Sequence, residues 1–119
     1  MHKKINAKYY HGKKIKAFTR LLRIMDELRE KCPWDKKQTM DSLRYLTIEE
    51  LYELSDAILD KNMKEIKKEL GDLLMHIVFY SRIASETNDF DISDVMNSVC
   101  AVSYTHLRAH ETEADLVCR

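Results

Sequence analysis

The sequence predicts an all-α fold, and three observations lead to that prediction. The chain has 119 residues with two glycines and one proline, which leaves little room for the turns of a β-rich protein. Apolar residues recur at steps of three and four through most of the chain, which is the period of a helix. The length suits one domain, and no apolar run approaches the ~18 residues that a bilayer span requires. We therefore expect an antiparallel helical bundle.

The first helix is expected over residues 15–31, where apolar side chains follow the helical period. Pro33 ends it, because the residue before a proline is disfavoured in α geometry. A loop containing Trp34 and Asp35 should follow. Residues 1–15 carry several lysines and no acidic residue. We interpret them as a solvated arm rather than a nucleic-acid-binding segment, because no fold supports the basic patch.

The second helix should begin near Thr39 or Asp41 and run to residue 59. Thr47 and Glu50 have the spacing of a capping box, which allows a break near Leu46. Residues 60–62 read as a short turn, so the second and third helices should be antiparallel neighbours.

The third helix is expected over residues 63–86, and a fourth should begin near Asp91 or Ser93. Within the third, residues 73–80 are apolar on nearly every side. A helix that is buried all round in so small a domain predicts a partner surface. A second copy is the expected partner, so that dimerisation completes a four-helix core.

Two acidic pairs lie on the second and third helices. Glu50 and Glu53 are three residues apart, as are Glu69 and Asp72, so each pair shares a helix face close to apolar neighbours. Four carboxylates near a core repel one another and are costly to desolvate unless a cation compensates them. Hard oxygen ligands of this kind suit Mg²⁺ or Mn²⁺ and phosphate chemistry. Gly71, inside the third helix, indicates close approach of a neighbouring helix or ligand.

The same residues carry a family resemblance. Glu49-Glu50-x-x-Glu53 followed by Glu69-x-x-Asp72 resembles the EExxE and ExxD motifs of the MazG-type all-α nucleoside triphosphate pyrophosphohydrolases. Residues 32–39 read CPWDKKQT and resemble the CPWDxxQT loop of that family. The similarity covers roughly residues 16–100, which we expect to be the catalytic domain.

The resemblance implies hydrolysis of a nucleoside triphosphate, NTP or dNTP, to the monophosphate and pyrophosphate, as in nucleotide-pool house-cleaning. It also implies Mg²⁺ as cofactor, with Mn²⁺ as a substitute. By motif position the metal ligands are Glu50, Glu53, Glu69 and Asp72. Glu49 completes the catalytic set, where it could bind a further metal ion or orient the attacking water. The substrate-binding candidates are Trp34, Lys36, Lys37 and Lys68, although each could equally have an ordinary structural role.

Alternative functions differ in what they require of the sequence. Dimeric dUTPases and phosphoribosyl-ATP pyrophosphohydrolases share the acidic pattern, but the CPWD segment favours MazG. A di-iron bundle needs Glu-x-x-His on two helices, and no Glu of this chain has His three residues later. A non-catalytic helical dimerisation module would show no metal-dependent change in stability. His76 lies one turn past Asp72, and we interpret it as a packed core histidine.

The last segment, residues 101–119, departs from the family pattern. It resembles translated sequencing-adaptor sequence, so we expect it to be non-native. His106 and His110 are four residues apart, but Leu107 stands where a zincin motif needs Glu, so no zinc site is expected.

Charge and cysteine content limit which partners and which cellular compartment we expect. Twenty basic and twenty acidic residues cancel, so no whole-chain field favours nucleic acid or a membrane surface. Three cysteines without a CxxC motif suit reduced thiols, and no secretory signal is recognisable. The expected location is cytoplasmic.

Overall fold

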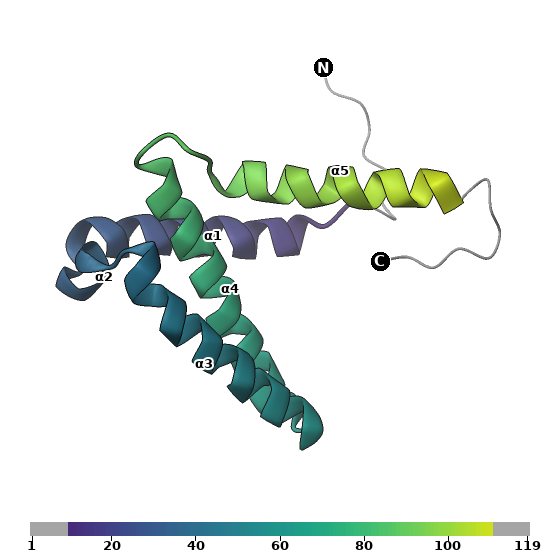
Figure 1. Cartoon of the computed structure of the whole chain (residues 1–119), viewed down its shortest axis with the longest axis horizontal. Helices are drawn as coiled ribbons and strands as arrows, with labels where there is room; N and C mark the ends of the chain where they lie inside the picture. The colour runs from purple at the N-terminus through teal and green to yellow at the C-terminus, as the bar shows by residue number, and fades with distance from the viewer. Residues whose placement is uncertain (1–9, 111–119) are drawn as a thin grey trace. The chain divides into compact units, whose positions relative to one another are not determined.

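The computed structural model describes residues 10–110, which form five helices and contain no strand (Figure 1). The all-α prediction is therefore confirmed. The chain divides into two compact units, residues 1–76 and residues 77–119. None of the described helices is long and apolar enough to cross a membrane. The helices are α1 (Gly12–Lys31), α2 (Pro33–Lys37), α3 (Met40–Leu59), α4 (Met63–Ser85) and α5 (Ile92–His110).

Pro33 is the first residue of α2 and follows the end of α1 at Lys31 by two positions. Proline suits the first position of a helix, because the N–H that it lacks would have no intrahelical partner. The expected loop around Trp34 is thus a short helix, which the sequence analysis missed. Arg29 of α1 secures it, because its Nη1 donates to the carbonyls of Asp35 at 2.7 Å and Gln38 at 2.9 Å.

Helix α3 begins with a capping box. The Thr39 side chain accepts from the Ser42 N–H, and the Ser42 side chain accepts from the Thr39 N–H. The break that the sequence allowed near Leu46 does not occur, since α3 runs unbroken to Leu59. Thr47 does not cap a helix, because its hydroxyl donates to the carbonyl of Leu43 one turn earlier at 3.1 Å.

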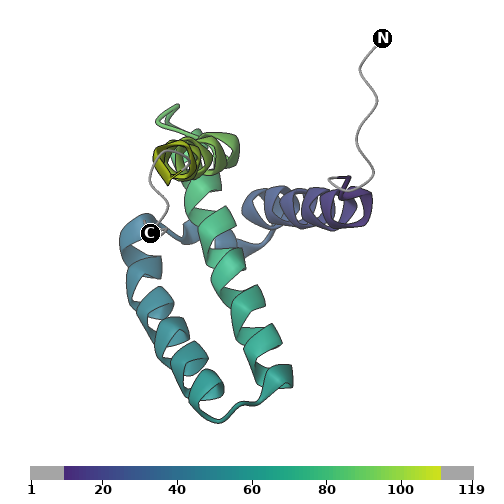
Figure 2. The ribbon, with the colours of Figure 1, turned by 90° about the vertical axis from the view of Figure 1, so that its right-hand side faces the viewer.

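A tight turn joins α3 to α4. Lys61 adopts a left-handed φ of 56°, and the Asn62 side chain accepts from the Glu65 N–H at 3.2 Å. Figures 1 and 2 show α3 lying beside the first half of α4 in the antiparallel sense. The predicted hairpin is confirmed, and it brings the two acidic pairs to facing helices.

The core of the first unit includes Met25 of α1 and Leu43 of α3, which are 1% and 0% exposed. In the second unit, Val78, Phe79 and Ala84 of α4 are buried. The apolar run of residues 73–80 is not buried all round, however, because Leu74 and Ile77 are about 40% exposed.

Helix α5 starts after Asp91, whose carboxylate accepts from the Asp94 N–H at 3.0 Å. The reciprocal bond from the Asp91 N–H to the Asp94 carboxylate closes the cap. The helix runs to His110 and so includes the first residues of the segment that we expect to be non-native. Its last turns contain neither Gly nor Pro, so a helix that has already formed propagates through them. Whether residues 101–119 are native stays a prediction.

Gly71 has no close neighbour. A Cβ added to it would meet nothing within 4 Å in the described part of the chain. The expectation that another helix of this chain approaches it is therefore wrong.

Candidate metal centre

Three carboxylates from two helices meet on the α3–α4 hairpin. Glu50 of α3 and Glu69 and Asp72 of α4 each offer an oxygen, and these oxygens lie within 4.8 Å of one another. Glu69 is 5% exposed, whereas Glu50 and Asp72 are partly exposed. A group of this size and donor type can hold one hard divalent cation.

The electrostatics of the cluster are unfavourable without such a cation. Burial, a hydrogen bond to Glu69 and the charges of Asp72, Glu53 and Glu69 together raise the pKa of Glu50 to about 7. The charge of Glu69 likewise raises the pKa of Glu53. The protein therefore holds protons on this cluster at pH values where isolated carboxylates are ionised.

Two buried oxygen atoms in the cluster lack a hydrogen-bond partner. They are Oε2 of Glu50 and Oε1 of Glu69. An unsatisfied buried acceptor is rare in proteins and costs free energy, more so when it carries charge. A divalent cation bound by these carboxylates would offset this cost, so the residues present fit the expected Mg²⁺ or Mn²⁺.

Comparison with known proteins identifies the domain. A family model for the MazG nucleotide pyrophosphohydrolase domain matches residues 38–102. The chain belongs to the MazG family. The matched range contains both acidic pairs and all three clustered carboxylates, so the cluster lies within the family's domain.

Named relatives are similar over the same part of the chain. The nucleoside triphosphate pyrophosphohydrolase/pyrophosphatase MazG of Thermotoga maritima is 48% identical over 84 residues, which are 69% of this chain and 33% of that protein. The nucleoside triphosphate pyrophosphohydrolase of Escherichia coli K12 is 43% identical over 83 residues, or 67% of this chain and 32% of that protein. The chain thus spans about a third of the length of these relatives.

A solved structure shares the fold. The crystal structure of a mazG-related protein from Thermotoga maritima superposes with a TM-score of 0.67 at 21% identity, covering 83% of this chain and 86% of that one. At this identity the likeness supports the all-α MazG fold and nothing finer.

The remaining predicted carboxylates lie outside the compact group. Glu53 is exposed and is not one of the three clustered ligands, although the effect of Glu69 on its pKa shows that it lies near. Glu49 is also exposed and does not join the group. The structure therefore unites three of the four predicted ligands and leaves the roles of Glu49 and Glu53 as predictions.

Lys68 lies at the cluster. Its Nζ is 3.1 Å from the Asp72 carboxylate and 3.4 Å from that of Glu69. Hydrogen bonding to Asp72 and the charge of that residue raise the pKa of the Lys68 ammonium. The side chain is 58% exposed, so it partly compensates the cluster while staying accessible to a ligand.

The other predicted substrate contacts lie on α2. Trp34 is 53% exposed, and Lys36 and Lys37 are exposed as well. Gln38 fixes this segment, because its Nε2 donates to the Trp34 carbonyl at 2.8 Å and its Oε1 accepts from the Ser42 hydroxyl at 2.8 Å. None of the three clustered ligands belongs to α2, so substrate binding by this helix stays a prediction.

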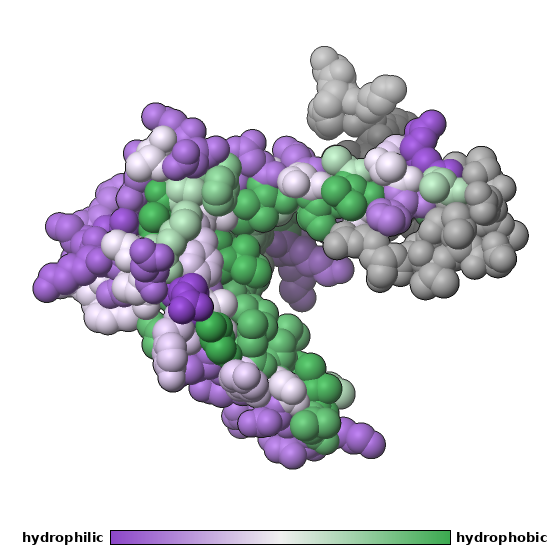
Figure 3. Space-filling view, in the orientation of Figure 1, coloured by the Kyte–Doolittle hydropathy of each residue, from purple (hydrophilic) through white to green (hydrophobic). Residues whose placement is uncertain are grey.

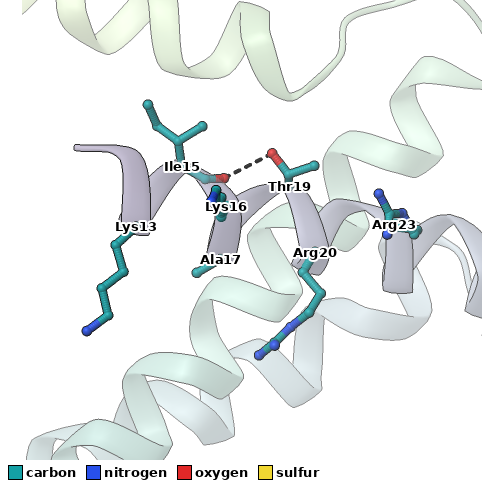
Figure 4. Close-up of a pocket in the computed structure, with 7 residues that line it drawn as sticks. All are labelled: Lys13, Ile15, Lys16, Ala17, Thr19, Arg20 and Arg23. Carbon is teal, nitrogen blue, oxygen red and sulfur yellow. Dashed lines mark hydrogen bonds between the residues drawn. The ribbon is translucent and has the colours of Figure 1, made fainter. Parts of the chain in front are cut away.

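A separate basic cavity of about 540 Å³ lies along α1 (Figure 4). Lys13, Lys16, Arg20 and Arg23 recur at steps of three and four residues there, and therefore share one helix face. None of the residues predicted to form the site lines it.

Sequence reasoning missed one contact beside the metal centre. Thr47 Oγ1 lies 2.7 Å from His76 Nδ1, which joins α3 to α4. We had interpreted His76 as a packed core histidine, and it is in fact only partly buried and hydrogen-bonded. Burial lowers the pKa of His76, which favours its neutral form. The only sign of this contact in the sequence is that Thr47 lies one turn from Glu50 and His76 lies one turn from Asp72.

The raised pKa of Glu50 gives a testable pH dependence. Between about pH 4.5 and pH 7 the unfolded chain has lost the Glu50 proton, whereas the folded chain retains it. The metal-free protein should therefore lose stability through Glu50 as the pH rises through this window. Urea unfolding in EDTA should show this loss in the wild type and a weaker loss in Glu50→Gln. Equal pH dependence in the two proteins would contradict it.

Proposed function

We propose that the chain is a Mg²⁺-dependent nucleoside triphosphate pyrophosphohydrolase that converts an NTP or dNTP to the monophosphate and pyrophosphate. The observation that carries this proposal is the cluster of Glu50, Glu69 and Asp72, with two unpartnered buried oxygens, inside a MazG domain. The names of the similar proteins from Thermotoga maritima and Escherichia coli support the same activity. They favour it over dUTP or phosphoribosyl-ATP hydrolysis and over a non-catalytic module.

Glu50, Glu69 and Asp72 would hold the metal ion, with Glu53 as a fourth ligand from the exposed end of the cluster. When bound there, Mg²⁺ would supply charge neutralisation at the phosphates and would make water a better nucleophile. The converging carboxylates, of which that of Glu69 is buried, would give the chain a fixed set of acceptors for the ion, which avoids reorganisation during the reaction.

The reaction adds water across the phosphoanhydride between the α- and β-phosphates. The water oxygen joins one phosphorus, the bond from that phosphorus to the bridging oxygen breaks, and a proton leaves the water. Glu49 is placed by its motif position to orient this water. Glu49 would also accept the proton that leaves the water.

Cations and one aromatic side chain would bind the rest of the substrate. Lys68 can turn from the carboxylates of Glu69 and Asp72 to a substrate phosphate, because more than half of its side chain is exposed. Lys36 and Lys37 are accessible for further phosphate contacts, and Trp34 offers an exposed ring against which a base could stack.

Product analysis tests the proposal. The full chain, incubated with Mg²⁺ and each of the common NTPs and dNTPs, should release nucleoside monophosphate and pyrophosphate in equal amounts. EDTA should stop the release. Formation of nucleoside diphosphate and orthophosphate would overturn the assignment and indicate a different phosphohydrolase.

We also infer that the domain functions as a homodimer in the cytoplasm. Large apolar side chains are exposed along the hairpin, including Leu51, Leu70 and Leu74 (Figure 3). A second copy would cover part of this surface and could approach closely at Gly71. The described cysteines, Cys32 and Cys100, are free thiols. Light scattering at micromolar concentration should give twice the mass of one chain, and a monomer would contradict the inference.

A further inference from the structure

The contact between Thr47 and His76 lies one helical turn beyond the carboxylate cluster on both helices. Thr47 comes three residues before Glu50, and His76 comes four residues after Asp72. Residues at these spacings share a helix face. The contact of 2.7 Å therefore joins the same two faces that carry the metal ligands.

The contacts of the Thr47 hydroxyl with Leu43 and His76 favour one position for the histidine proton. The hydroxyl has one hydrogen, and the carbonyl of Leu43 at 3.1 Å can only accept. Both contacts are hydrogen bonds at once only when Thr47 donates to Leu43 and accepts from Nδ1–H of His76. The imidazole is then neutral with its proton on Nδ1, in agreement with the burial that lowers its pKa.

The contact opposes a force that the cluster creates. Without a cation, the carboxylate of Glu50 faces those of Glu69 and Asp72 across the hairpin. Once Glu50 is ionised as well, its charge and those of Glu69 and Asp72 repel one another across the hairpin and tend to separate α3 and α4. A hydrogen bond between the helices one turn away resists this separation and keeps the oxygen atoms at the spacing that one cation needs.

We propose that Thr47 and His76 form a positioning pair that fixes the spacing of the carboxylates on α3 and α4 and thereby sets the metal affinity. His76 acts through Nδ1–H and Thr47, and it neither binds the ion nor reacts with substrate. This inference rests on the proposed function, since it assumes that the cluster binds a divalent cation. Removing a residue that orients metal ligands commonly weakens metal binding about 10- to 100-fold.

Four single variants of the full chain separate the positioning role from other roles of the two residues. Thr47→Val removes the hydroxyl at nearly constant shape, whereas Thr47→Ser restores it. His76→Asn keeps an N–H donor near the place of Nδ1, whereas His76→Gln extends past it toward the place of Nε2. Calorimetric titration with Mn²⁺ should show about tenfold or greater weakening in Thr47→Val and His76→Gln. Thr47→Ser and His76→Asn should bind within about threefold of the wild type.

Two further measurements do not depend on catalysis. Long-range ¹⁵N–¹H NMR spectra of the metal-free protein should show the His76 proton on Nδ1, and Thr47→Val should shift the ring toward the other tautomer. In a double-mutant cycle, Thr47→Val combined with His76→Gln should bind Mn²⁺ no more weakly than either single variant, because one contact is lost in each.

Several outcomes would overturn the inference. Weak Mn²⁺ binding by His76→Asn with normal binding by His76→Gln would assign the role to Nε2. Wild-type affinity in all four variants would show that the contact has no effect on the site, and a wild type that binds no Mn²⁺ would refute it outright. A wild type that binds Mn²⁺ but releases no pyrophosphate would refute the proposed activity alone, because the titrations would still report on the pair.

Discussion

Glu69→Gln should make the protein more stable than the wild type without Mg²⁺ and less stable than the wild type with it. Glu69 is 5% exposed and has an unpartnered Oε1, so the amide removes a buried charge at constant shape. In EDTA the variant should be more stable than the wild type, because the repulsion with Glu50 and Asp72 is relieved. In Mg²⁺ the order should invert, since a cation that binds only the folded state stabilises it by about 2.7 kcal/mol at 100 times its Kd.

The rate of catalysis should also decrease in Glu69→Gln, because this variant lacks one of the proposed metal ligands. We expect pyrophosphate release by Glu69→Gln to decrease about 100-fold or more, because loss of ~3 kcal/mol of charge stabilisation corresponds to two decades of rate. Glu65→Gln is the matched control, since Glu65 lies one turn earlier on α4, is exposed and is not one of the clustered ligands. Thermal melts with and without Mg²⁺ would decide the matter. An unchanged Mg²⁺ shift in Glu69→Gln would exclude Glu69 as a ligand.

Leu43→Ala should have the largest effect on stability. Leu43 is 0% exposed, and truncation of a buried leucine costs about 2–5 kcal/mol, partly for the cavity left behind. The melting temperature should fall by roughly 10–20 °C in a domain of this size.

Leu59→Ala is the matched control, because it makes the same change on the same helix at a side chain that is 75% exposed. It should alter the free energy of unfolding by no more than about 0.5 kcal/mol. Chemical denaturation of both variants in EDTA would separate the effect from metal binding. Equal destabilisation would show that Leu43 is not part of a packed core.

The helix boundaries were largely predictable because their signals are local. Pro33 marks the end of α1, and the turn at residues 60–62 was recognisable from its polar residues. Helix α2 was missed, because five residues hold too little periodic signal to tell a short helix from a loop. The break that the sequence allowed near Leu46, and that the structure lacks, had a different cause. Thr47 has the spacing of a helix cap, but within a longer helix its hydroxyl bonds to the preceding turn instead.

The site was predictable to the level of residue pairs. The three-residue spacing placed Glu50 with Glu53 and Glu69 with Asp72, but it could not show that Glu53 lies outside the compact group. The bond between Thr47 and His76 joins residues 29 positions apart. Such a contact depends on how two helices are aligned, and neither helix encodes that alone.

The turn at Lys61 controls this alignment, and with it the permitted lengths of the segment between the two motifs. One residue inserted into α4 before Glu69 would rotate the following carboxylates by about 100° and advance them by ~1.5 Å, away from Glu50. Lengthening both arms by about seven residues, close to two full turns each, would bring them back into phase. The hairpin therefore keeps the carboxylates together only for certain lengths of its two arms. Insertions of other lengths can preserve every helix of this chain and still separate the three clustered carboxylates.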